Sequence, residues 1–336
     1  MGYIKLNKKS FFHNLDYFSA KCGTKDKLAI ALKDNAYGHG IEQISLMCKE
    51  YGIKNVFVRN LSEASIAKKY RFETILMLYD IPELKDDSIV ISINSIECLK
   101  KVPKQSKIEL KIDTGMNRNG IDTSEITKAL ELIEKNDLIL NGLFTHFCCA
   151  DEDNNITTIQ EKKFLSIIPQ IKETITYDFK IHCANSAGVH KVDMDMYDMA
   201  RIGIGAYGYL DLKEEKYLKP ILSLYANKIT TKKLKKDEHI GYGSCAYIVP
   251  FDMTVSNYDI GYGDGLFRIP DDTIAYIAND KKILGRISMD SFSCIGDDEE
   301  VCVFNNVTHL ANIHKTIKYE ILTNLKANIK RVIVDF

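Results

Sequence analysis

The sequence predicts an α/β protein, a (β/α)8 barrel of the TIM type followed by a mostly β C-terminal domain. Two observations lead to this fold class. Between residues 28 and 203, eight short apolar runs of strand character alternate with segments of helical periodicity, as expected for a barrel of strand–helix units. After about Leu218 the pattern changes to short β-rich runs separated by Gly and Asp turns, which indicates a separate β domain.

The predicted barrel elements follow one another in a regular order. The candidate strands are Leu28–Leu32, Asn55–Val58, Thr74–Leu78, Ile89–Ile93, Ile108–Ile112, Leu138–Thr145, Phe179–Cys183 and Tyr197–Ile202. Helical periodicity fits best between them, at Ile41–Tyr51, Ser62–Lys69, Ser95–Lys101, Ser124–Asn136 and Thr158–Glu173. The fourth helix has a suitable start at Ser124, and Asp122 just upstream favours its N-terminal end.

The length of 336 residues suits one barrel-sized domain and a smaller one. We expect residues 8–217 to form the barrel and residues 218–336 the β-rich domain. Tyr3–Leu6 has the character of a strand ahead of the first helix.

Composition excludes several classes of function. The net charge of −1 gives no reason to expect nucleic acid or an anionic membrane as partner. No apolar stretch reaches the roughly 18 residues of a membrane span, and the first residues lack a signal-peptide pattern. The nine cysteines include no CxxC pair, so we expect reduced thiols, no metal site and a cytoplasmic protein.

The segment LAIALKDNAYGHG at Leu28–Gly40 is the most informative in the chain. An apolar strand ends at Lys33, a tight turn follows, and a helix begins after the turn. A lysine at the end of a buried strand loses part of its hydration, which lowers its pKa and makes its amine nucleophilic. On position alone, a lysine that only extends its amine into solvent is the commoner alternative.

Other polar residues also follow the carboxyl ends of predicted strands, where barrel enzymes build their active sites. They are Arg118 after the fifth strand, His146 after the sixth, His182 and Ser186 at and after the seventh, and Arg201 and Gly203 at the eighth. Taken singly, each could be structural, and either histidine could be a hydrogen-bonded core residue. Together they converge on one face of the predicted barrel.

The last two strand-end loops suit a phosphate group. Barrels often hold phosphate with the loops after strands seven and eight. Here these loops contain NSAG at Asn185–Gly188 and RIGIG at Arg201–Gly205. Glycines allow backbone N–H groups to approach an anion closely, and the Ser186 hydroxyl can donate a hydrogen bond.

Eight motifs resemble those of the alanine racemase family, in the family's order and over nearly the whole chain. They are ALKDNAYGHG (Ala31–Gly40), KIDTGMNRNGI (Lys111–Ile121), GLFTHFCCADE (Gly142–Glu152), HCANSAGV (His182–Val189), RIGIGAYG (Arg201–Gly208), GYGSCAY (Gly241–Tyr247), IGYGDGLFR (Ile260–Arg268) and GRISMD (Gly285–Asp290). The resemblance implies an isomerase of fold type III that uses pyridoxal 5'-phosphate (PLP). Its implied reaction interconverts L-alanine and D-alanine and supplies D-alanine for peptidoglycan.

The resemblance also assigns cofactor-binding residues. It implies that Lys33 carries PLP covalently. It implies that Tyr37, Ser186 and the backbone of Gly203 and Ile204 bind the PLP phosphate.

The cationic residues receive separate roles from the resemblance. Arg201 is implied to face the pyridine nitrogen, with His146 beside it; because arginine stays protonated, the nitrogen remains unprotonated and transamination is suppressed. Arg118 is implied to bind the PLP phenolic oxygen and to approach the substrate carboxylate. Lys111 matches a lysine that is carbamylated in several relatives, and a carbamate there would orient Arg118. An ordinary interior lysine paired with an acid is the alternative.

Racemisation needs a base on each face of the α-carbon. The resemblance assigns one face to Lys33 and the other to Tyr242 from the second subunit of a homodimer. Since a phenol with an ordinary pKa near 10 is a poor base at neutral pH, a relay through His146 to Arg201 is implied. The residues implied to line the substrate pocket across the dimer are Tyr262, Met289 and Asp290.

The family pattern further implies that residues 1–7 form a strand of the C-terminal domain. Two positions depart from that pattern. Lys330 replaces a tyrosine that shapes the family's substrate pocket, and Gly263 replaces an alanine.

Three other functions share parts of this pattern. A racemase for serine or for a broader range of amino acids would differ only in the pocket. A non-catalytic PLP carrier has the barrel but lacks the β domain and the second base, so the presence of residues 219–336 argues against it. A two-domain PLP decarboxylase needs its own glycine-rich and cysteine motifs, which the sequence does not contain.

Overall fold

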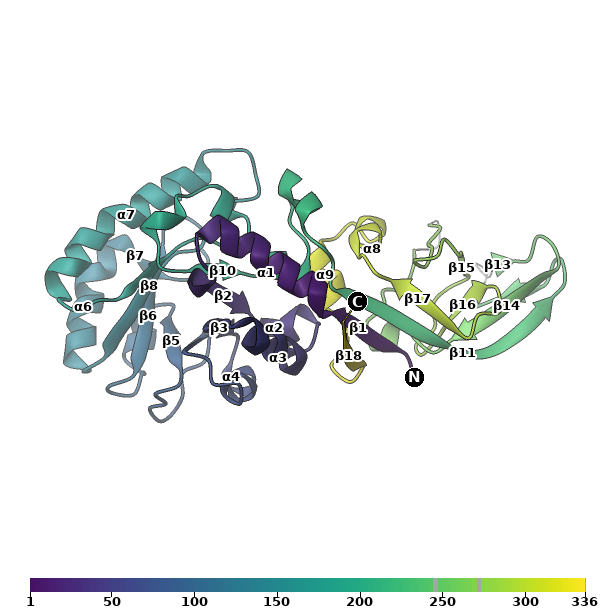
Figure 1. The fold of residues 1–336 in the computed structure, drawn as a ribbon, viewed down its shortest axis with the longest axis horizontal. Helices are drawn as coiled ribbons and strands as arrows, with labels where there is room; N and C mark the ends of the chain where they lie inside the picture. The colour runs from purple at the N-terminus through teal and green to yellow at the C-terminus, as the bar shows by residue number, and fades with distance from the viewer. Residues whose placement is uncertain (244–246, 271–272, 336) are drawn as a thin grey trace. The chain divides into compact units, whose positions relative to one another are not determined.

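Eight parallel strands form a nearly closed barrel in the computed structural model, which describes residues 1–243, 247–270 and 273–335. Their order around the barrel is β10 (Ala200–Ile202), β2 (Leu28–Ala31), β3 (Asn55–Val58), β4 (Thr74–Met77), β5 (Val90–Ile93), β6 (Lys107–Asp113), β8 (Ile139–Phe144) and β9 (Lys180–His182). A short strand, β7 (Ile121–Asp122), pairs with the end of β6. The parallel pairing of consecutive strands confirms the predicted fold class (Figure 1).

The barrel closes where the segments of β9 and β10 meet. The amide of Asp198 donates to the carbonyl of Ile181 and the amide of Arg201 donates to the carbonyl of Ala184, each at 2.9 Å. An isolated parallel bridge between Asn185 and Arg201 continues this contact. Closure brings the first and last strands together, so the residues that follow all eight strands surround one mouth of the barrel.

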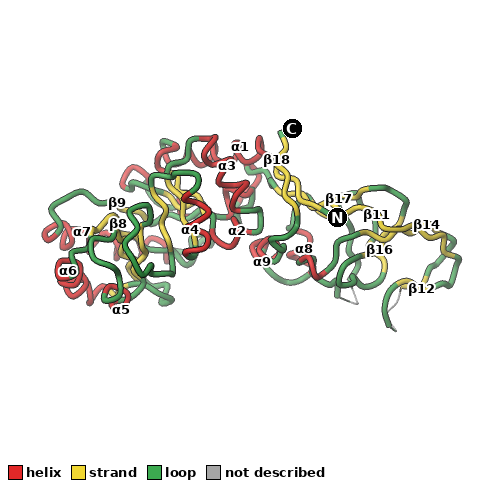
Figure 2. The backbone as a smooth tube through the Cα atoms, turned by 90° about the horizontal axis from the view of Figure 1, so that it is seen from below, coloured by secondary structure: helices red, strands yellow, loops and turns green. Residues whose placement is uncertain are grey.

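The barrel helices lie close to their predicted positions. They are α3 (Ile41–Tyr51), α4 (Leu61–Lys68), α5 (Ile96–Leu99), α6 (Ile126–Lys135) and α7 (Ile156–Thr174), and α1 (Lys8–Cys22) precedes the first barrel strand. In Figures 1 and 2, α4, α6 and α7 lie outside the barrel strands. The start of α6 differs from prediction, because Asp122 caps a short 3-10 turn at Thr123–Glu125 and the α-helix begins only at Ile126.

A left-handed turn, labelled α2 (Lys33–Tyr37), follows β2. Asp34, Asn35, Ala36 and Tyr37 all have φ between 52° and 53°. Non-glycine residues rarely adopt this conformation, because it costs roughly 1–2 kcal/mol per residue. The surrounding structure must therefore hold these four residues in place.

The C-terminal part forms a mostly β sheet. Its order is β15 (Ile283–Leu284), β16 (Phe292–Ile295), β14 (Met253–Tyr258), β11 (Leu222–Leu234), β1 (Tyr3–Asn7) and β18 (Lys330–Val334), and β17 (Glu300–Phe304) also pairs with β11. The first strand, β1, lies antiparallel to β11 and parallel to β18. A separate pair joins β12 (His239–Ile240) to β13 (Tyr247–Ile248), and two short helices, α8 (Thr308–Ile313) and α9 (Lys318–Thr323), precede β18.

Two compact units result. We call Ser10–Ala36 with Ile44–Lys219 the barrel unit, and Met1–Lys9, Tyr37–Gln43 and Pro220–Phe336 together the sheet unit. Helices long and apolar enough to cross a membrane are absent from the described part of the chain.

The segment Tyr37–Gln43 groups with the sheet unit because Arg331 of β18 binds it. The Arg331 guanidinium donates from Nε and Nη2 to the carbonyl of Gly38, at 3.1 and 2.7 Å. It also donates from Nη1 to the carbonyls of Ala327 and Ile329. The ring of Tyr37 lies 5.7 Å from that of Tyr319 in α9. The planar guanidinium of Arg331 thus links Gly38, just after the turn, to the last strand of the sheet unit.

Candidate functional site

Arg201 is the centre of the barrel site. Its side chain lies in β10, 4% exposed, and its guanidinium makes several hydrogen bonds. Nη1 lies 2.7 Å from Nδ1 of His182, and Nη2 lies 2.7 Å from the carbonyl of Thr145 and 3.3 Å from Nδ1 of His146. Burial lowers the pKa of Arg201 to about 10, so the group remains a cation at neutral pH.

Both histidines beside Arg201 are uncharged at neutral pH. Burial lowers the pKa of His146 well below its usual value, and the nearby cations Arg201, Lys111 and Arg118 lower it further. Burial also lowers the pKa of His182. Because a guanidinium only donates, the Nδ1 atoms of both rings must accept.

Lys33 comes two residues after the end of β2 and is half-buried. Burial lowers the pKa of its amine; Asp34 opposes this shift and Arg118 adds to it. A lowered pKa raises the fraction of neutral, nucleophilic amine at neutral pH. The lysine therefore has the property that its strand-end position predicted.

Polar contacts hold the left-handed turn after Lys33. The Glu63 carboxylate accepts from the amides of Asn35 and Arg59, at 3.1 and 2.8 Å. The Arg59 guanidinium in turn bonds to the Asp34 carboxylate at 2.8 Å. These contacts stabilise a conformation that the residues would not adopt alone.

Lys111 lies inside the barrel on β6, and its amine donates to the side-chain amide oxygen of Asn119. Burial lowers the pKa of Lys111 to about 8, and the neighbouring Arg118 and Arg201 contribute to the shift. Arg118 lies in the loop that joins β6 to β7, and its side chain is exposed. The hydrogen-bond partner of Lys111 is thus an amide rather than the acid expected for an ordinary interior lysine.

The loops after β9 and β10 are joined through the Ser186 hydroxyl. The Ser186 Oγ accepts from the amides of Gly203 and Gly205, at 2.9 and 3.3 Å. Because both bonds use its oxygen, the hydroxyl proton stays available to donate. A Cβ on Gly205 would lie 2.4 Å from Cζ of Phe18, so any other residue here would displace that buried ring. Tyr37, also predicted to bind phosphate, belongs to the sheet unit.

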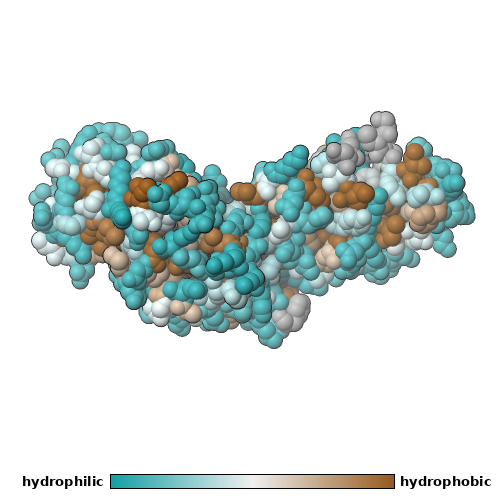
Figure 3. Space-filling model, turned by 90° about the horizontal axis from the view of Figure 1, so that it is seen from above, coloured by the Kyte–Doolittle hydropathy of each residue, from teal (hydrophilic) through white to brown (hydrophobic). Residues whose placement is uncertain are grey.

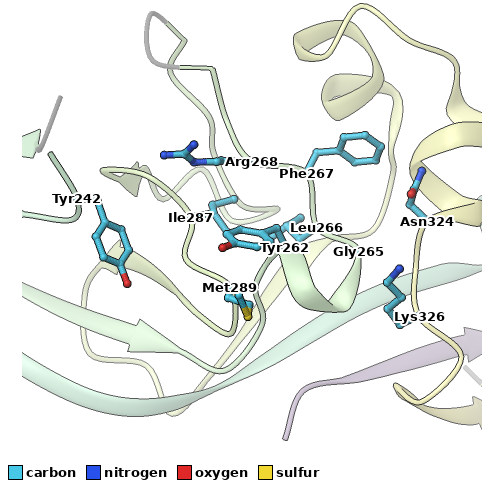
Figure 4. Close-up of a pocket in the computed structure, with 10 residues that line it drawn as sticks. All are labelled: Tyr242, Tyr262, Gly265, Leu266, Phe267, Arg268, Ile287, Met289, Asn324 and Lys326. Atoms are coloured by element: carbon cyan, nitrogen blue, oxygen red, sulfur yellow. The ribbon is translucent and has the colours of Figure 1, made fainter. Parts of the chain in front are cut away.

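A second group of predicted residues surrounds a cavity in the sheet unit. Tyr242, Tyr262 and Met289 line a pocket of about 660 Å³, together with Arg268 and residues near Leu266 and Asn324 (Figure 4). Backbone bonds join its two loops: the amide of Tyr262 donates to Ser288 and that of Gly263 to Met289, at 3.1 and 2.7 Å. Asp290 is exposed beside this pocket.

Close packing explains the glycine that departs from the family pattern. A Cβ on Gly263 would lie 3.0 Å from the carbonyl oxygen of Met289. An alanine would therefore need a small shift of the loop that carries Met289. The neighbouring motif GYGSCAY is described only in part, because residues 244–246 lie outside the described residues.

The structure thus brings together the predicted residues of the barrel and, separately, those of the sheet unit. The relay from Tyr242 through His146 stays a prediction, because its two ends belong to different units.

Glu109 and Asn119 were not predicted from the sequence. Glu109 is fully buried in β6, and its carboxylate lies 2.9 Å from Nε2 of His182. A signal was present in the sequence, since an acid inside the apolar run KIELKI points to the same face as Lys111 two residues later. Asn119 lies in an irregular loop, where no periodicity indicates side-chain direction.

Comparisons with known proteins identify the family. The alanine racemase N-terminal domain model matches residues 6–211, and the C-terminal domain model matches residues 221–333. An alanine racemase of Nitratiruptor sp. is 41% identical over 342 residues, covering 100% of both chains. One of Campylobacter jejuni is 38% identical and covers 99% of this chain and 100% of its own.

Solved structures show the same fold. An alanine racemase of Clostridium difficile superposes with a TM-score of 0.89 at 23% identity, covering 99% of this chain and 96% of that one. The Bacillus anthracis enzyme with bound L-Ala-P gives a TM-score of 0.87 at 24% identity, covering 99% and 95%. From the two family models and the full-length relatives, we conclude that this chain belongs to the alanine racemase family.

Proposed function

We propose that this protein interconverts L-alanine and D-alanine with PLP bound at the mouth of the barrel. The observation that supports this most strongly is the presence of two different basic groups in one barrel: Lys33, whose amine has a lowered pKa, and Arg201, a buried cation held between two neutral histidines. Full-length relatives named alanine racemase supply the substrate class.

The residues at the barrel mouth fit PLP. When bound, PLP supplies an electron sink that makes the α-hydrogen of an amino acid acidic. Lys33 would hold the cofactor covalently through its side-chain amine. The Ser186 hydroxyl and the amide of Ile204 would hold its phosphate, and the amide of Gly203 would join them by exchanging its bond to the Ser186 oxygen for one to phosphate. The Tyr37 phenol is proposed as a further donor. Arg201 can face the ring nitrogen and, as a permanent cation, leave that nitrogen without a proton.

Proton transfer requires two groups on opposite faces of the α-carbon. Lys33 serves one face as acid and base. We assign the other face to Tyr242 of a second copy, with Tyr262, Met289 and Asp290 completing the substrate pocket. Arg118 binds the substrate carboxylate, and carbamylated Lys111 orients it.

The surface of the sheet unit supports a homodimer. Tyr242 is 64% exposed and Met289 is 56% exposed, although both are large side chains beside a cavity. Ile248 and Phe251 are also exposed nearby in the sequence, and apolar side chains reach the surface of this unit in Figure 3. Exposed apolar groups around a pocket are typical of an interface.

An assay of racemisation over a panel of L-amino acids tests the proposal. Purified protein with added PLP should convert L-alanine to D-alanine faster than it racemises L-serine or larger L-amino acids. The loss of optical rotation of each solution measures the rate. A preference for serine would favour the broader racemase, and an absence of racemisation with every amino acid would contradict the proposal.

A further inference from the structure

Glu109 is a charged side chain buried in the barrel interior, and the proposed reaction assigns it no role. It is 0% exposed, and it lies opposite Gly142 of β8 in the strand register. A Cβ on Gly142 would lie 3.0 Å from both Cγ and Cδ of Glu109. The neighbouring strand therefore makes room for this carboxylate by carrying no side chain.

Three polar groups from two strands surround the carboxylate. The Asn141 amide nitrogen donates to Oε1 at 3.1 Å, His182 lies 2.9 Å from Oε2, and the Lys180 ammonium is close enough to act on its charge. Burial alone would raise the pKa of Glu109, but these neighbours lower it overall. The group is therefore an anion at neutral pH.

The hydrogen-bond partners fix the proton on His182. A carboxylate only accepts, so Nε2 of His182 must carry a hydrogen toward Glu109. A guanidinium only donates, so Nδ1 must be unprotonated toward Arg201 at 2.7 Å. His182 is thus neutral in its Nε2–H form and connects a buried cation to a buried anion.

We propose that Glu109 is a positioning residue for Arg201, acting through His182. Its carboxylate fixes the ring of His182, the ring fixes the guanidinium, and the buried negative charge balances the buried positive one. This logic is that of an acid that orients a histidine in a catalytic triad. The catalytic consequence rests on the proposed function, because Arg201 then meets the PLP nitrogen in one orientation and as a cation.

The first test needs no activity. Nitrogen-15 spectra of histidine-labelled protein report which ring nitrogen carries a proton. At neutral pH, His182 should be neutral with its hydrogen on Nε2, with the signal assigned by its loss in His182→Asn. A doubly protonated ring, or a hydrogen on Nδ1, would overturn the proposal.

The second test compares Glu109→Gln with Glu161→Gln. Glu161 is a matched control, because its carboxylate also accepts from a buried side chain, the Tyr197 hydroxyl at 2.7 Å, whereas the described hydrogen bonds of Arg201 go to His182, His146, Thr145 and Cys183. Glu109→Gln should disturb the fixed proton position on His182, seen as a changed or averaged nitrogen spectrum. Glu161→Gln should leave that spectrum unchanged. An unaltered His182 spectrum in a folded Glu109→Gln protein would contradict the positioning role.

The third test uses the PLP-loaded enzyme and measures the ratio of two reactions. In half-transamination, the amino acid becomes an oxo acid as PLP becomes pyridoxamine phosphate, and a fixed cation at the ring nitrogen suppresses this outcome. At metal sites, loss of a residue that hydrogen-bonds to a metal ligand lowers metal affinity or activity by about 10- to 100-fold. We expect Glu109→Gln to raise the ratio of transamination to racemisation by roughly tenfold.

Combination with His182→Asn completes this test. If Glu109 acts through His182, the double variant should show no larger ratio than His182→Asn alone, whereas independent effects would multiply. Multiplied effects, or an equal rise in Glu161→Gln, would overturn the proposal. If the wild-type protein racemises no amino acid, the proposed function fails, while the nitrogen spectra still decide whether Glu109 positions His182. A Glu109→Gln protein that does not fold leaves the wild-type spectrum as the deciding result.

Discussion

At the residue scale, the site depends on cations that the barrel holds partly or wholly out of water. Burial shifts the pKa values of Lys33, Lys111 and Arg201 downward by the same physical cause, with different consequences. For the two lysines, the shift raises the fraction of neutral amine at a given pH. For Arg201, whose pKa stays at about 10, the charge persists. One environment therefore yields two nucleophilic amines and one permanent cation.

This difference leads to a prediction for Lys111. A neutral amine adds to carbon dioxide and releases a proton, so carbamate formation should increase as the pH rises through about 8, where the Lys111 amine loses its proton. Carbon-13 spectra in labelled bicarbonate should show one carbamate signal that weakens on acidification. Lys111→Met should remove it.

Lys180 provides the matched control for this measurement. It is a partly buried lysine of the barrel strands, and its amine donates to the side chains of Asn55 and Thr74, each at 3.0 Å. Lys180→Met should keep the carbamate signal. A signal that survives Lys111→Met would place the carbamate on another residue. If the wild-type protein shows no carbamate signal at any pH below or above about 8, Lys111 is not carbamylated.

At the element scale, the chemistry depends on a short segment that is costly to form. Four successive non-glycine residues after Lys33 adopt positive φ. Glu63 and Arg59 hold one end of this turn, and Arg331 binds the carbonyl of Gly38 at the other. The strained turn therefore depends on contacts from segments far apart in the sequence.

Gly38 provides a test of how tightly this segment is held. It has φ +79°, and a Cβ there would lie 1.9 Å from the carbonyl oxygen of Leu322. Gly23 has a similar φ of +85° but open space around it. Gly23→Ala should therefore lose only the conformational cost of roughly 1–2 kcal/mol in the free energy of unfolding. Gly38→Ala should lose several kcal/mol and weaken PLP binding.

Chemical denaturation of both variants measures this difference. Equal losses of stability in Gly38→Ala and Gly23→Ala would show that the Leu322 contact does not constrain the turn.

The elements of the fold follow from the sequence more closely than the site does. All eight barrel strands lie within a few residues of their predicted positions, because short apolar runs are a strong local signal. The left-handed turn could not be predicted, since its residues have no local preference for positive φ and are held by distant partners such as Arg331. Glu109 was not predicted for a related reason. Its role depends on His182, 73 residues away, and on the room that Gly142 leaves by having no side chain.

At the scale of the whole molecule, the predicted catalytic groups are divided between two units. Lys33, His146 and Arg201 belong to the barrel unit, whereas Tyr242 and Met289 belong to the sheet unit. In the proposed homodimer, each barrel receives the sheet-unit residues of the partner, so a single chain has incomplete sites. The exposed Tyr242 is consistent with a residue that functions against a second copy.

Subunit mixing tests this division. Lys33→Ala and Tyr242→Phe should each be strongly impaired, because a positioned acid–base group contributes roughly 10²–10⁴-fold. After equal mixing and exchange, half of the dimers should be mixed and should have one of two sites intact. Activity should then recover to about one quarter of wild type. No recovery after verified exchange would mean that each site is built within one chain.

Reduction of the purified, PLP-loaded protein with borohydride, followed by peptide mapping, shows which lysine carries the cofactor. Hydride converts the bond between a lysine amine and PLP into a stable secondary amine, so the modified residue can be identified by mass. Because Lys33 is half-buried just after β2 and its amine has a lowered pKa, we predict one modified peptide that contains Lys33. Lys33→Arg should yield none, whereas Lys111→Arg should still yield the Lys33 adduct. Stoichiometric labelling of any other lysine, or no trapping in protein that retains PLP, would contradict the assignment of this site.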